Sequence, residues 1–302
     1  MILDESEIDD AKQAGRIAAK AITLGKSLIK PNARMVEVLD SVESFIKDQG
    51  AGMAFPAQIA INNIAAHYCS LKDDPTTFKE TDIIKLDLGT HINGIVADTA
   101  ITVIFDDNEK YDELKKIKQA SEEALENAIK ILRLGITLGE IGLIIQESIA
   151  KHDLSPIKNL SGHGLGKYSV HEHPTIPNFN TNDKTELEEN QLIAIEPFAT
   201  NGHGMIYESS NPTIFSVHKF KPVRSQFARE ILRDIQAFNG LPFTTRWLNH
   251  SEAKIRLAFN ELRNVGILQE FPPLLEVNNG LVSQSEHTVI IREKPVITTL
   301  RK

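Results

Sequence analysis

The chain of 302 residues has a single cysteine, Cys69, so no disulfide can form within it. Structural disulfides occur mainly in secreted proteins, and their absence favours a reducing compartment. No stretch approaches the roughly 20 apolar residues that are needed to span a bilayer. The acidic start, MILDESEIDDAKQ, also lacks the apolar run of a signal peptide. We therefore expect a cytoplasmic location and no membrane partner.

Positive charge is also scarce. The net charge of −8 provides no overall positive field for a phosphate backbone, so DNA is not an expected partner. Hydrophobic residues make up 41% and charged residues 25% of the chain, which is typical of a globular protein. The length is sufficient for one large domain or two smaller ones.

Apolar residues at helical spacing predict two helices before residue 50. The first follows Ser6 and ends before Pro31, and the second begins near Met35 and ends at Gly50. Short apolar runs separated by turn residues then predict strands from Ala54 to Phe105.

The same order occurs a second time. A long helix is predicted from about Glu109 to Leu132, and the letters TLGE, Thr137 to Glu140, form a capping box that opens a shorter helix. Strand-like segments follow from Ile157 to Phe215. We interpret this order as a weak internal duplication, although chance similarity between amphipathic helices would look the same. Two such halves around one sheet predict a single α+β domain.

The segment from about Pro222 to Phe271 has a different character. It contains two amphipathic helices that each end at a glycine, SQFAREILRDIQAFNG and SEAKIRLAFNELRNVG. Lys221 to Leu275 carries eight Lys and Arg against five Asp and Glu, a net charge of +3. We expect a compact helical insertion here. Two strands return after it, at Gly280 to Val282 and from Glu286 onward.

Two aspartates occupy strands that should belong to a core. The letters KLDLGTHINGIVADTAITV predict a hairpin with a turn near Ile92 to Gly94, and the strands carry Asp87 and Asp98 among apolar residues. An ionised carboxylate that is buried alone is very costly, so such a group is normally paired or bound to a metal. Across an antiparallel hairpin the two aspartates would be opposite or diagonal neighbours.

Other acids and histidines also occupy unusual positions. His163 stands between two glycines with His171 after it, Glu196 ends an apolar strand, and Glu286 begins the last one. Taken singly, each of these residues, like a lone Asp in a strand, is more often a turn or strand-end residue. Together, the candidate ligands form a hard, oxygen-rich set: Asp87, Asp98, His163, Glu196 and Glu286. Four clustered carboxylates would repel one another without cations, and two divalent ions such as Mn, Fe, Co or Zn would suit this set.

Five stretches of the chain resemble the motif blocks of type-II methionine aminopeptidases. They are GMAFPAQIAINNIAAHY, KLDLGTHINGIVADTAITV, SGHGLGKYSVHEHPTIP, AIEPFATNG and FPPLLEVNNGLVSQSEHTVIIRE. The resemblance covers nearly the whole chain in order, and the helical insertion before Glu286 is what separates type II from type I. The long charged N-terminal extension of eukaryotic members is absent, so the chain resembles the short archaeal form.

The resemblance implies a pita-bread fold, which is a pseudo-two-fold α+β sandwich of antiparallel sheet with helices on one side. The catalytic domain would comprise residues 1–220 and 276–302, and residues 221–275 would form a winged-helix-like insertion. The family's metal ligands map onto the five residues above. Asp87 would bind one metal ion, His163 and Glu196 the other, and Asp98 and Glu286 would bridge them.

The resemblance also implies an activity, the hydrolytic removal of N-terminal methionine from nascent proteins and peptides with a small second residue. His171 would donate a hydrogen bond to the reacting amide, His67 would bind the substrate, and Glu196 would move protons. The methionine pocket would be lined by Phe55, Val170 and Phe271. A tyrosine often stands at the position of Phe271 in relatives, and PAQIA after Phe55 is also less typical. The family suggests a monomer.

Two rival functions remain open at this stage. A proline-specific peptidase would share the fold and a similar ligand set, but usually carries an additional N-terminal domain. A non-catalytic binding protein of the same fold would have lost metal ligands, all five of which are present here. For the insertion, contact with ribosomal RNA is one hypothesis, and a structural lid that brings Phe271 to the pocket is the favoured one.

Overall fold

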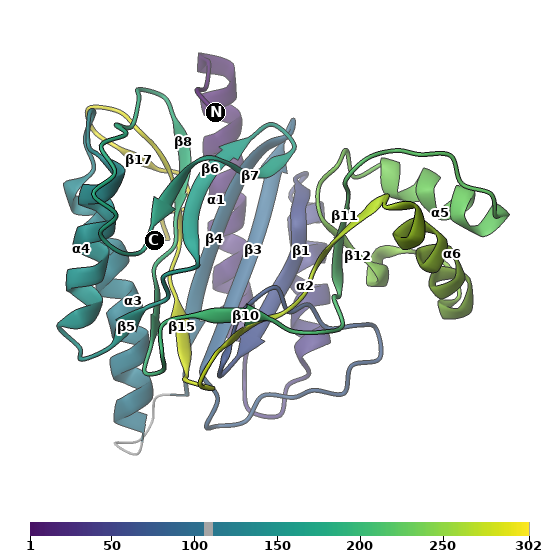
Figure 1. Ribbon diagram of the computed structural model, residues 1–302, viewed down its shortest axis with the longest axis horizontal. Helices are drawn as coiled ribbons and strands as arrows, with labels where there is room; N and C mark the ends of the chain where they lie inside the picture. Colours follow the sequence, from purple (N-terminus) through teal and green to yellow (C-terminus); the bar gives the residue numbers. More distant parts are fainter. Residues whose placement is uncertain (106–110, 302) are drawn as a thin grey trace.

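The computed structural model of the chain describes residues 1–105 and 111–301. A main body of helices and strands carries a smaller lobe that projects from one side (Figure 1). The first half of the body contains α1 (Glu5–Leu28), α2 (Met35–Asp48), β1 (Gly52–Ile61), β2 (Ile64–Ala66), β3 (Ile84–Ile92) and β4 (Ile95–Val103). The second half contains α3 (Asp112–Ile131), α4 (Leu138–Ala150), β5 (Ser155–Pro156), β6 (Ser161–Gly166), β7 (Ser169–Pro177), β8 (Leu192–Ile195), β9 (Phe198–Thr200) and β10 (Ile206–Glu208).

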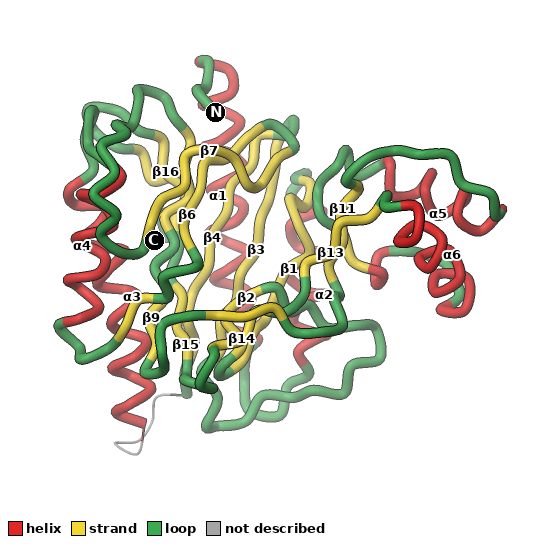
Figure 2. The backbone as a smooth tube through the Cα atoms, in the orientation of Figure 1, coloured by secondary structure: helices red, strands yellow, loops and turns green. Residues whose placement is uncertain are grey.

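The lobe and the end of the chain complete the fold. The lobe contains β11 (Ile214–Val217), α5 (Gln226–Gln236), β12 (Phe243–Thr244), the short 3-10 helix η2 (Thr245–Trp247), α6 (Glu252–Val265) and β13 (Leu268–Phe271). The chain returns to the body as β14 (Leu274–Glu276), β15 (Val282–Gln284), β16 (His287–Ile290) and β17 (Val296–Ile297). Two helices followed by strands occur in each half of the body, as the sequence predicts (Figure 2).

The strands of the body pair antiparallel, and one hairpin sets the position of the two aspartates. The sheets include the orders β1-β3-β4 and β17-β16-β8-β6-β7. Asn93 and Gly94 join β3 to β4 with φ of 51° and 90°, the left-handed pair that a tight two-residue hairpin needs. In this register Asp87 is opposite Ala100 and Asp98 is opposite Gly89. The two carboxylates are therefore diagonal neighbours on one face of the hairpin.

The end of the chain joins the hairpin to the second half. The hydroxyl of Thr288 on β16 accepts a hydrogen bond from the Asp98 N–H at 2.7 Å and donates to the Asp98 carbonyl at 2.7 Å. The Glu286 N–H donates to the Ala100 carbonyl at 3.0 Å. These bonds lay the strand after Glu286 beside β4, so acids from the two halves lie close together.

Amphipathic helices cover the strands. Helix α1 packs on β3 and β4, α2 packs on β1, and α3 packs on α4 and β15. In the view of Figure 1, α1 and α2 lie behind the strands that they cover. The predicted capping box is present, because the Thr137 hydroxyl accepts from the Glu140 N–H while the Glu140 carboxylate accepts from the Thr137 N–H. This cap fixes the start of α4.

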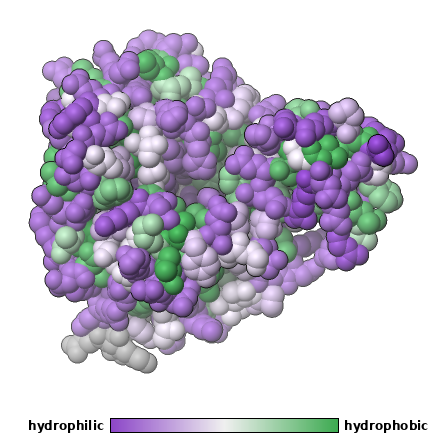
Figure 3. All heavy atoms as spheres, in the orientation of Figure 1, coloured by the Kyte–Doolittle hydropathy of each residue, from purple (hydrophilic) through white to green (hydrophobic). Residues whose placement is uncertain are grey.

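The lobe has its own hydrophobic core. Buried members of this core include Phe215, Phe243, Phe259, Leu262 and Ile267. Its small sheet has the order β12-β11-β13, and its two helices stand on the side away from the body (Figure 1). The space-filling view shows the lobe projecting with a largely hydrophilic surface (Figure 3). Because β11 precedes residue 221, the lobe's sheet includes residues before the expected boundary of the insertion.

Some predicted boundaries differ from the structure. Helix α5 ends at Gln236 rather than near Gly240, because the chain turns at Ala237. The strand predicted from Gly280 to Val282 begins only at Val282, as β15, since the Gly280 N–H donates to the Glu276 carboxylate instead of a neighbouring strand. The strand after Glu286 is not the last one, because β17 follows it. The expected start of the long helix at Glu109 lies outside the described residues.

The Glu276 side chain fastens two loops to the body, one between β9 and β10 and one between β14 and β15. It is 0% exposed and accepts hydrogen bonds from the backbone N–H groups of His203, Gly204, Asn278 and Gly280, the last three at 3.1, 2.7 and 2.8 Å. Burial alone would raise its pKa, but these backbone donors outweigh that effect and hold the pKa of Glu276 below its usual value.

The helices within residues 1–105 and 111–301 include none with the length and apolar character that a membrane span needs.

We expect Glu276→Gln to lower the free energy of unfolding by about 2 kcal/mol at pH 7, because hydrogen bonds to a charged group contribute about 1.5–3 kcal/mol each. The folded pKa is the lower one, so this contribution is complete above the unfolded pKa of about 4.3. It is lost as the pH falls through the folded pKa. Urea denaturation at pH 7 and pH 3 measures the effect, with the exposed Glu208→Gln as control. An equal difference at both pH values would contradict the assignment.

Candidate metal centre

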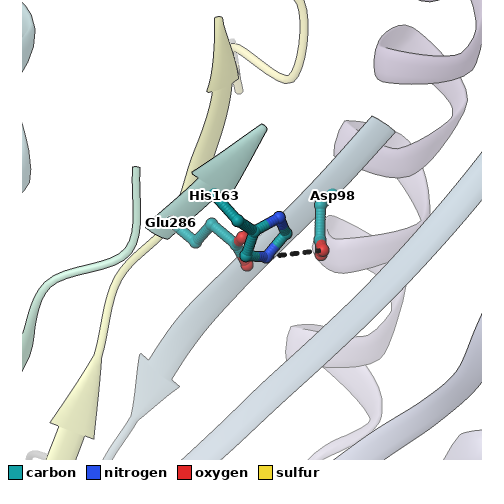
Figure 4. A group of neighbouring side chains, drawn as sticks. All are labelled: Asp98, His163 and Glu286. Carbon is teal, nitrogen blue, oxygen red and sulfur yellow. Dashed lines mark ion pairs between the residues drawn. The ribbon is translucent and has the colours of Figure 1, made fainter. Parts of the chain in front are cut away.

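The five predicted ligands meet in one cavity of about 320 Å³. They come from separate strands of the body: Asp87 from β3, Asp98 from β4, His163 from β6, Glu196 from the residue after β8, and Glu286 from the residue before β16. Figure 4 shows Asp98 and His163, from two strands, and Glu286, from the segment that joins β15 to β16, pointing toward one another. Glu196 falls just outside β8 because Pro197, which follows it, has no N–H for a strand ladder.

The donor atoms lie at distances that an ion could bridge. One ligand atom from each of Asp98, His163 and Glu286 lies within 4.8 Å of the others. The Nε2 of His163 is 3.6 Å from Glu196 Oε1 and 4.0 Å from Asp98 Oδ2. Asp87 adds a carboxylate from the same face of the hairpin.

Several oxygens of this cluster are buried without a hydrogen-bond partner among the described residues. They are Asp87 Oδ1, Asp98 Oδ1 and Glu286 Oε1. An unpaired buried carboxylate oxygen costs free energy, so three of them in one cavity imply a partner of another kind. Divalent cations supply that partner, and a set of carboxylates with one imidazole suits ions such as Mn, Fe, Co or Zn. The donors present thus fit a metal centre.

The pKa values of the four acids in the cavity also indicate bound cations. Burial raises the pKa of Asp87 to about 7. Burial, followed by the charge of Asp87, raises the pKa of Asp98 well above its usual value. Burial and the neighbouring carboxylates raise the pKa values of Glu196 and Glu286 in the same way. Without cations these acids would hold protons, whereas bound cations would favour the ionised forms.

The imidazole of His163 is oriented for a metal. Its Nδ1 is 3.1 Å from the Gly164 carbonyl, and a proton on Nδ1 that is donated there leaves a lone pair on Nε2, which faces the acids. Burial lowers the pKa of His163 to about 3, so the ring is neutral at physiological pH. A neutral ring with a free Nε2 is the form that binds metals.

Two further histidines border the same cavity. His171, on β7, lies with its ring centroid 4.6 Å from that of His163, edge to face. Its side chain is exposed, yet the protein around it lowers its pKa by desolvation. His67 has φ of 62° and packs edge to face on Phe271 at 5.8 Å. Burial lowers the pKa of His67 to about 4, and its Nδ1 has no partner among the described residues.

The predicted pocket residues Phe55, Val170 and Phe271 line the cavity as well. Phe55 and Val170 are buried residues of the body, whereas Phe271 comes from β13 of the lobe. Their carbon atoms lie beside the five candidate metal ligands, so the same cavity has an apolar wall and a polar part.

Sequence reasoning missed several residues that line this cavity, and also Gln284, which contacts a lining residue from outside it. Gln58 lies opposite Asp87 in the β1–β3 pair, and its Oε1 accepts from the His67 N–H at 2.7 Å. Gln284 donates from Nε2 to Glu196 Oε2 at 3.2 Å. Gln284 stands two residues before Glu286, a spacing that strand alternation could have flagged. The remaining missed lining residues are Ala66, Asn159, Leu160, Ser161, Phe198, Ile214 and Pro242.

Comparisons with known proteins agree with this geometry. The model of metallopeptidase family M24 matches residues 9–293. A methionine aminopeptidase of Archaeoglobus fulgidus is 41% identical over 292 residues, covering 96% of this chain and 97% of the relative. That of Thermococcus onnurineus is 43% identical over 292 residues, covering 95% of this chain and 97% of the relative.

Solved structures share the fold. A methionine aminopeptidase of Thermotoga maritima superimposes with a TM-score of 0.73 at 24% identity and covers 100% of this chain and 99% of its own. A thermophilic Arx1 superimposes with a TM-score of 0.86 at 15% identity and covers 98% of this chain and 91% of its own. At these identities the likeness supports the fold alone, and it confirms the expected pita-bread α+β architecture.

We expect divalent cations to raise the melting temperature of metal-stripped protein, because an ion that binds only the folded state stabilises it by mass action. A metal at 100 times its dissociation constant would add about 2.7 kcal/mol to the free energy of unfolding. Asp98→Asn should abolish most of this rise, whereas the exposed Asp9→Asn should keep it. Thermal melts with and without Mn²⁺ or Co²⁺ measure the effect. A rise that Asp98→Asn leaves intact would place the ion elsewhere.

Proposed function

The chain belongs to metallopeptidase family M24, and on this premise we propose that it removes the N-terminal methionine from peptides and nascent proteins by hydrolysis. The observation that carries the proposal is the identity of 41% to 43% with methionine aminopeptidases over nearly the full chain. The gathering of four carboxylates and a histidine in one cavity agrees with it. The reaction is that of a metal-dependent aminopeptidase.

Two divalent ions are part of the proposal. Asp87, Asp98, His163, Glu196 and Glu286 would hold them, and the orphaned carboxylate oxygens support this assignment. When bound, such ions supply Lewis acidity that polarises a scissile carbonyl and lowers the pKa of a water. Which of Mn, Co, Fe and Zn is bound depends on the ions available in the cell.

Glu196 is the proposed proton carrier. Its carboxylate lies 3.6 Å from the His163 ring through Oε1, while Oε2 accepts from Gln284. The Gln284 amide holds the carboxylate in one orientation. A group that takes a proton from water and returns it to the leaving amine needs such a fixed orientation. Gln284 is thus a positioning residue in this scheme.

His171 and His67 are the proposed substrate contacts. Both rings are neutral at physiological pH because desolvation by the surrounding protein lowers their pKa values, so each carries one N–H that can donate to a carbonyl or amide oxygen. His171 would stabilise negative charge on the reacting carbonyl oxygen. His67 is held by Gln58 through its backbone N–H, and its buried Nδ1 has no partner among the described residues, which supports a contact with the substrate.

An apolar wall is suited to the methionine side chain. Phe55, Val170 and Phe271 supply it, and the cavity of about 320 Å³ is large enough for one long unbranched side chain. The thioether of methionine makes favourable contacts with aromatic rings. Phe271 has no hydroxyl, so this wall gives selectivity by shape. A preference for a small second residue is part of the proposal.

The insertion, residues 221–275, is proposed to act as a lid. Pro242 and Phe271 come from it and border the cavity, which supports a role in closing the methionine pocket. Contact of the lobe with ribosomal RNA, which its net charge of +3 would permit, stays a hypothesis. We further propose a monomer that acts in the cytoplasm, where new chains begin with methionine.

The two rival functions are less well supported. The curated relatives at 41% and 43% identity are named methionine aminopeptidases, which favours methionine over proline-directed cleavage. All five donors are present, which favours catalysis over a binding role.

We expect metal-loaded protein to release free methionine from a Met-Ala-Ser peptide and to leave an Xaa-Pro dipeptide intact. Asp98→Asn should lower kcat by about 10³-fold or more, because a missing ligand removes the Lewis acid that acts on the carbonyl. The surface variant Asp9→Asn should match wild type. Chromatographic measurement of released methionine with Mn, Co, Fe or Zn tests this. Cleavage of the Xaa-Pro dipeptide alone would favour the proline-specific rival.

His171→Ala should lower kcat by about 10²-fold, the usual cost of losing one donor to a developing oxyanion. Metal content should stay at the wild-type level, because His171 is not among the proposed ligands. Steady-state kinetics together with metal analysis of the purified variant measure both quantities. Loss of metal from this variant would instead make His171 part of the metal centre.

A further inference from the structure

One buried carboxylate lies where the main body meets the lobe, outside the metal centre. Glu43, on α2, is 3% exposed. A buried carboxylate must be hydrogen-bonded or paired to be tolerated. The partners of Glu43 come from two directions, one in the body and one in the lobe.

The partner on the body side is β1. The Ala57 N–H donates to Glu43 Oε1 at 3.2 Å. The β1–β3 register is irregular between Phe55 and Gln58, so Ala57 has no partner in the strand ladder and its N–H is available for Glu43. Phe55 and Gln58, on either side of this irregularity, both line the cavity. Glu43 therefore fixes the backbone of one cavity wall.

The partners on the lobe side are consecutive residues of η2. Arg246 donates from Nη2 to Glu43 Oε1 at 2.7 Å and from Nη1 to Oε2 at 3.0 Å, and the Trp247 Nε1–H donates to Oε2 at 2.7 Å. The Arg246 and Glu43 side chains are 6% and 4% exposed. Burial opposes the guanidinium charge, but Glu43 and Cys69 together outweigh burial and keep the pKa of Arg246 above its usual value.

The residues beside η2 form the second wall of the cavity. In the lobe sheet, Ile214 of β11 pairs with Thr244 of β12 on one side and with Phe271 of β13 on the other. Ile214 and Phe271 line the cavity, and so does Pro242, which directly precedes β12. In Figure 1, β11 and β12 lie between β1 and the lobe helices. The hydrogen bonds between Arg246 and Glu43 therefore position this whole wall.

We propose that Glu43 is a positioning residue that sets the spacing of the two walls of the methionine pocket. Its carboxylate ties the wall of Phe55 and Gln58 to the wall of Ile214 and Phe271 through one set of hydrogen bonds. This inference rests on the proposed function, because the spacing matters for catalysis only if the methionine side chain enters there. The contact between Glu43 and Arg246 governs recognition of the side chain, since the candidate metal ligands Asp98, His163 and Glu196 are held by other contacts.

The first test is a set of single variants. Glu43→Gln and Arg246→Lys should raise KM for Met-Ala-Ser about tenfold with kcat within about threefold of wild type, the pattern of lost binding without lost chemistry. The preference for Met-Ala-Ser over Leu-Ala-Ser should narrow, and metal content should not change. Asp40→Asn is the matched control, because Asp40 contacts the same guanidinium but is 61% exposed and, within the described part of the chain, has no hydrogen bond to β1. It should behave as wild type.

The only tryptophan of the chain reports on the tie directly. The indole N–H of Trp247 is bound to Glu43, so loss of the tie should hydrate the ring and shift its emission to longer wavelength. Glu43→Gln should show this shift and Asp40→Asn should not. Unchanged emission together with unchanged KM in Glu43→Gln would overturn the proposal.

A double variant distinguishes the effect of losing the Glu43–Arg246 contact on KM from its effect on the stability of the protein. Glu43→Ala would leave Arg246 buried without its partner, which is strongly destabilising and could abolish folding. Glu43→Leu combined with Arg246→Met leaves no unpaired charge, and such apolar replacements are often neutral or stabilising. We expect this protein to melt near the wild-type temperature and yet keep the raised KM. A KM that returns to the wild-type value as stability returns would make the pair merely structural.

Wild-type behaviour distinguishes the two ways of failing. If metal-loaded wild type releases methionine and the variants match it, the inference about Glu43 is wrong while the proposed function stands. If wild type neither releases methionine nor binds free methionine in calorimetry, the proposed function is wrong and the inference falls with it. If wild type binds free methionine without cleavage, the dissociation constant replaces KM, and it should rise about tenfold in Glu43→Gln.

Discussion

Mutual repulsion among four carboxylates in one cavity is the constraint on which the rest of this structure depends. Each of Asp87, Asp98, Glu196 and Glu286 has a pKa raised by burial, and neighbouring charges add to the effect for the last three. A chain free to relax would separate these groups. The fold holds them together, with orphaned oxygens aimed at one place, and divalent cations are the partners that make this arrangement stable.

The scaffold that imposes this arrangement is built from pieces distant in the chain. The Asn93–Gly94 turn sets the hairpin register that places Asp87 and Asp98 on one face. Thr288 then fastens β16 to the backbone of Asp98, and this brings Glu286 from the other half of the chain. Neither half assembles the donor set alone, which is why the two helix-and-strand halves must pack as one domain.

The lobe adds a second level of organisation. It has its own core around Phe215 and Phe259, yet its sheet edge reaches the cavity through Phe271. The buried Glu43 and Arg246 pair joins this unit to α2 and β1. The candidate metal ligands and part of the apolar wall thereby belong to different units, because the ligands come from the body while Phe271 comes from the lobe.

The sequence by itself determined the helices and the hairpin and singled out the five candidate ligands, because each leaves a local mark. The TLGE capping box, the Asn93–Gly94 turn and an aspartate inside an apolar strand are such marks. Only the tertiary structure decided the roles of Gln58, Pro242 and Glu43. Gln58 meets the His67 backbone across a loop, and Glu43 meets Arg246 across a separation of 203 residues. Whether the partners are nine or 203 residues apart, packing brings them together, and no local pattern of side chains records them.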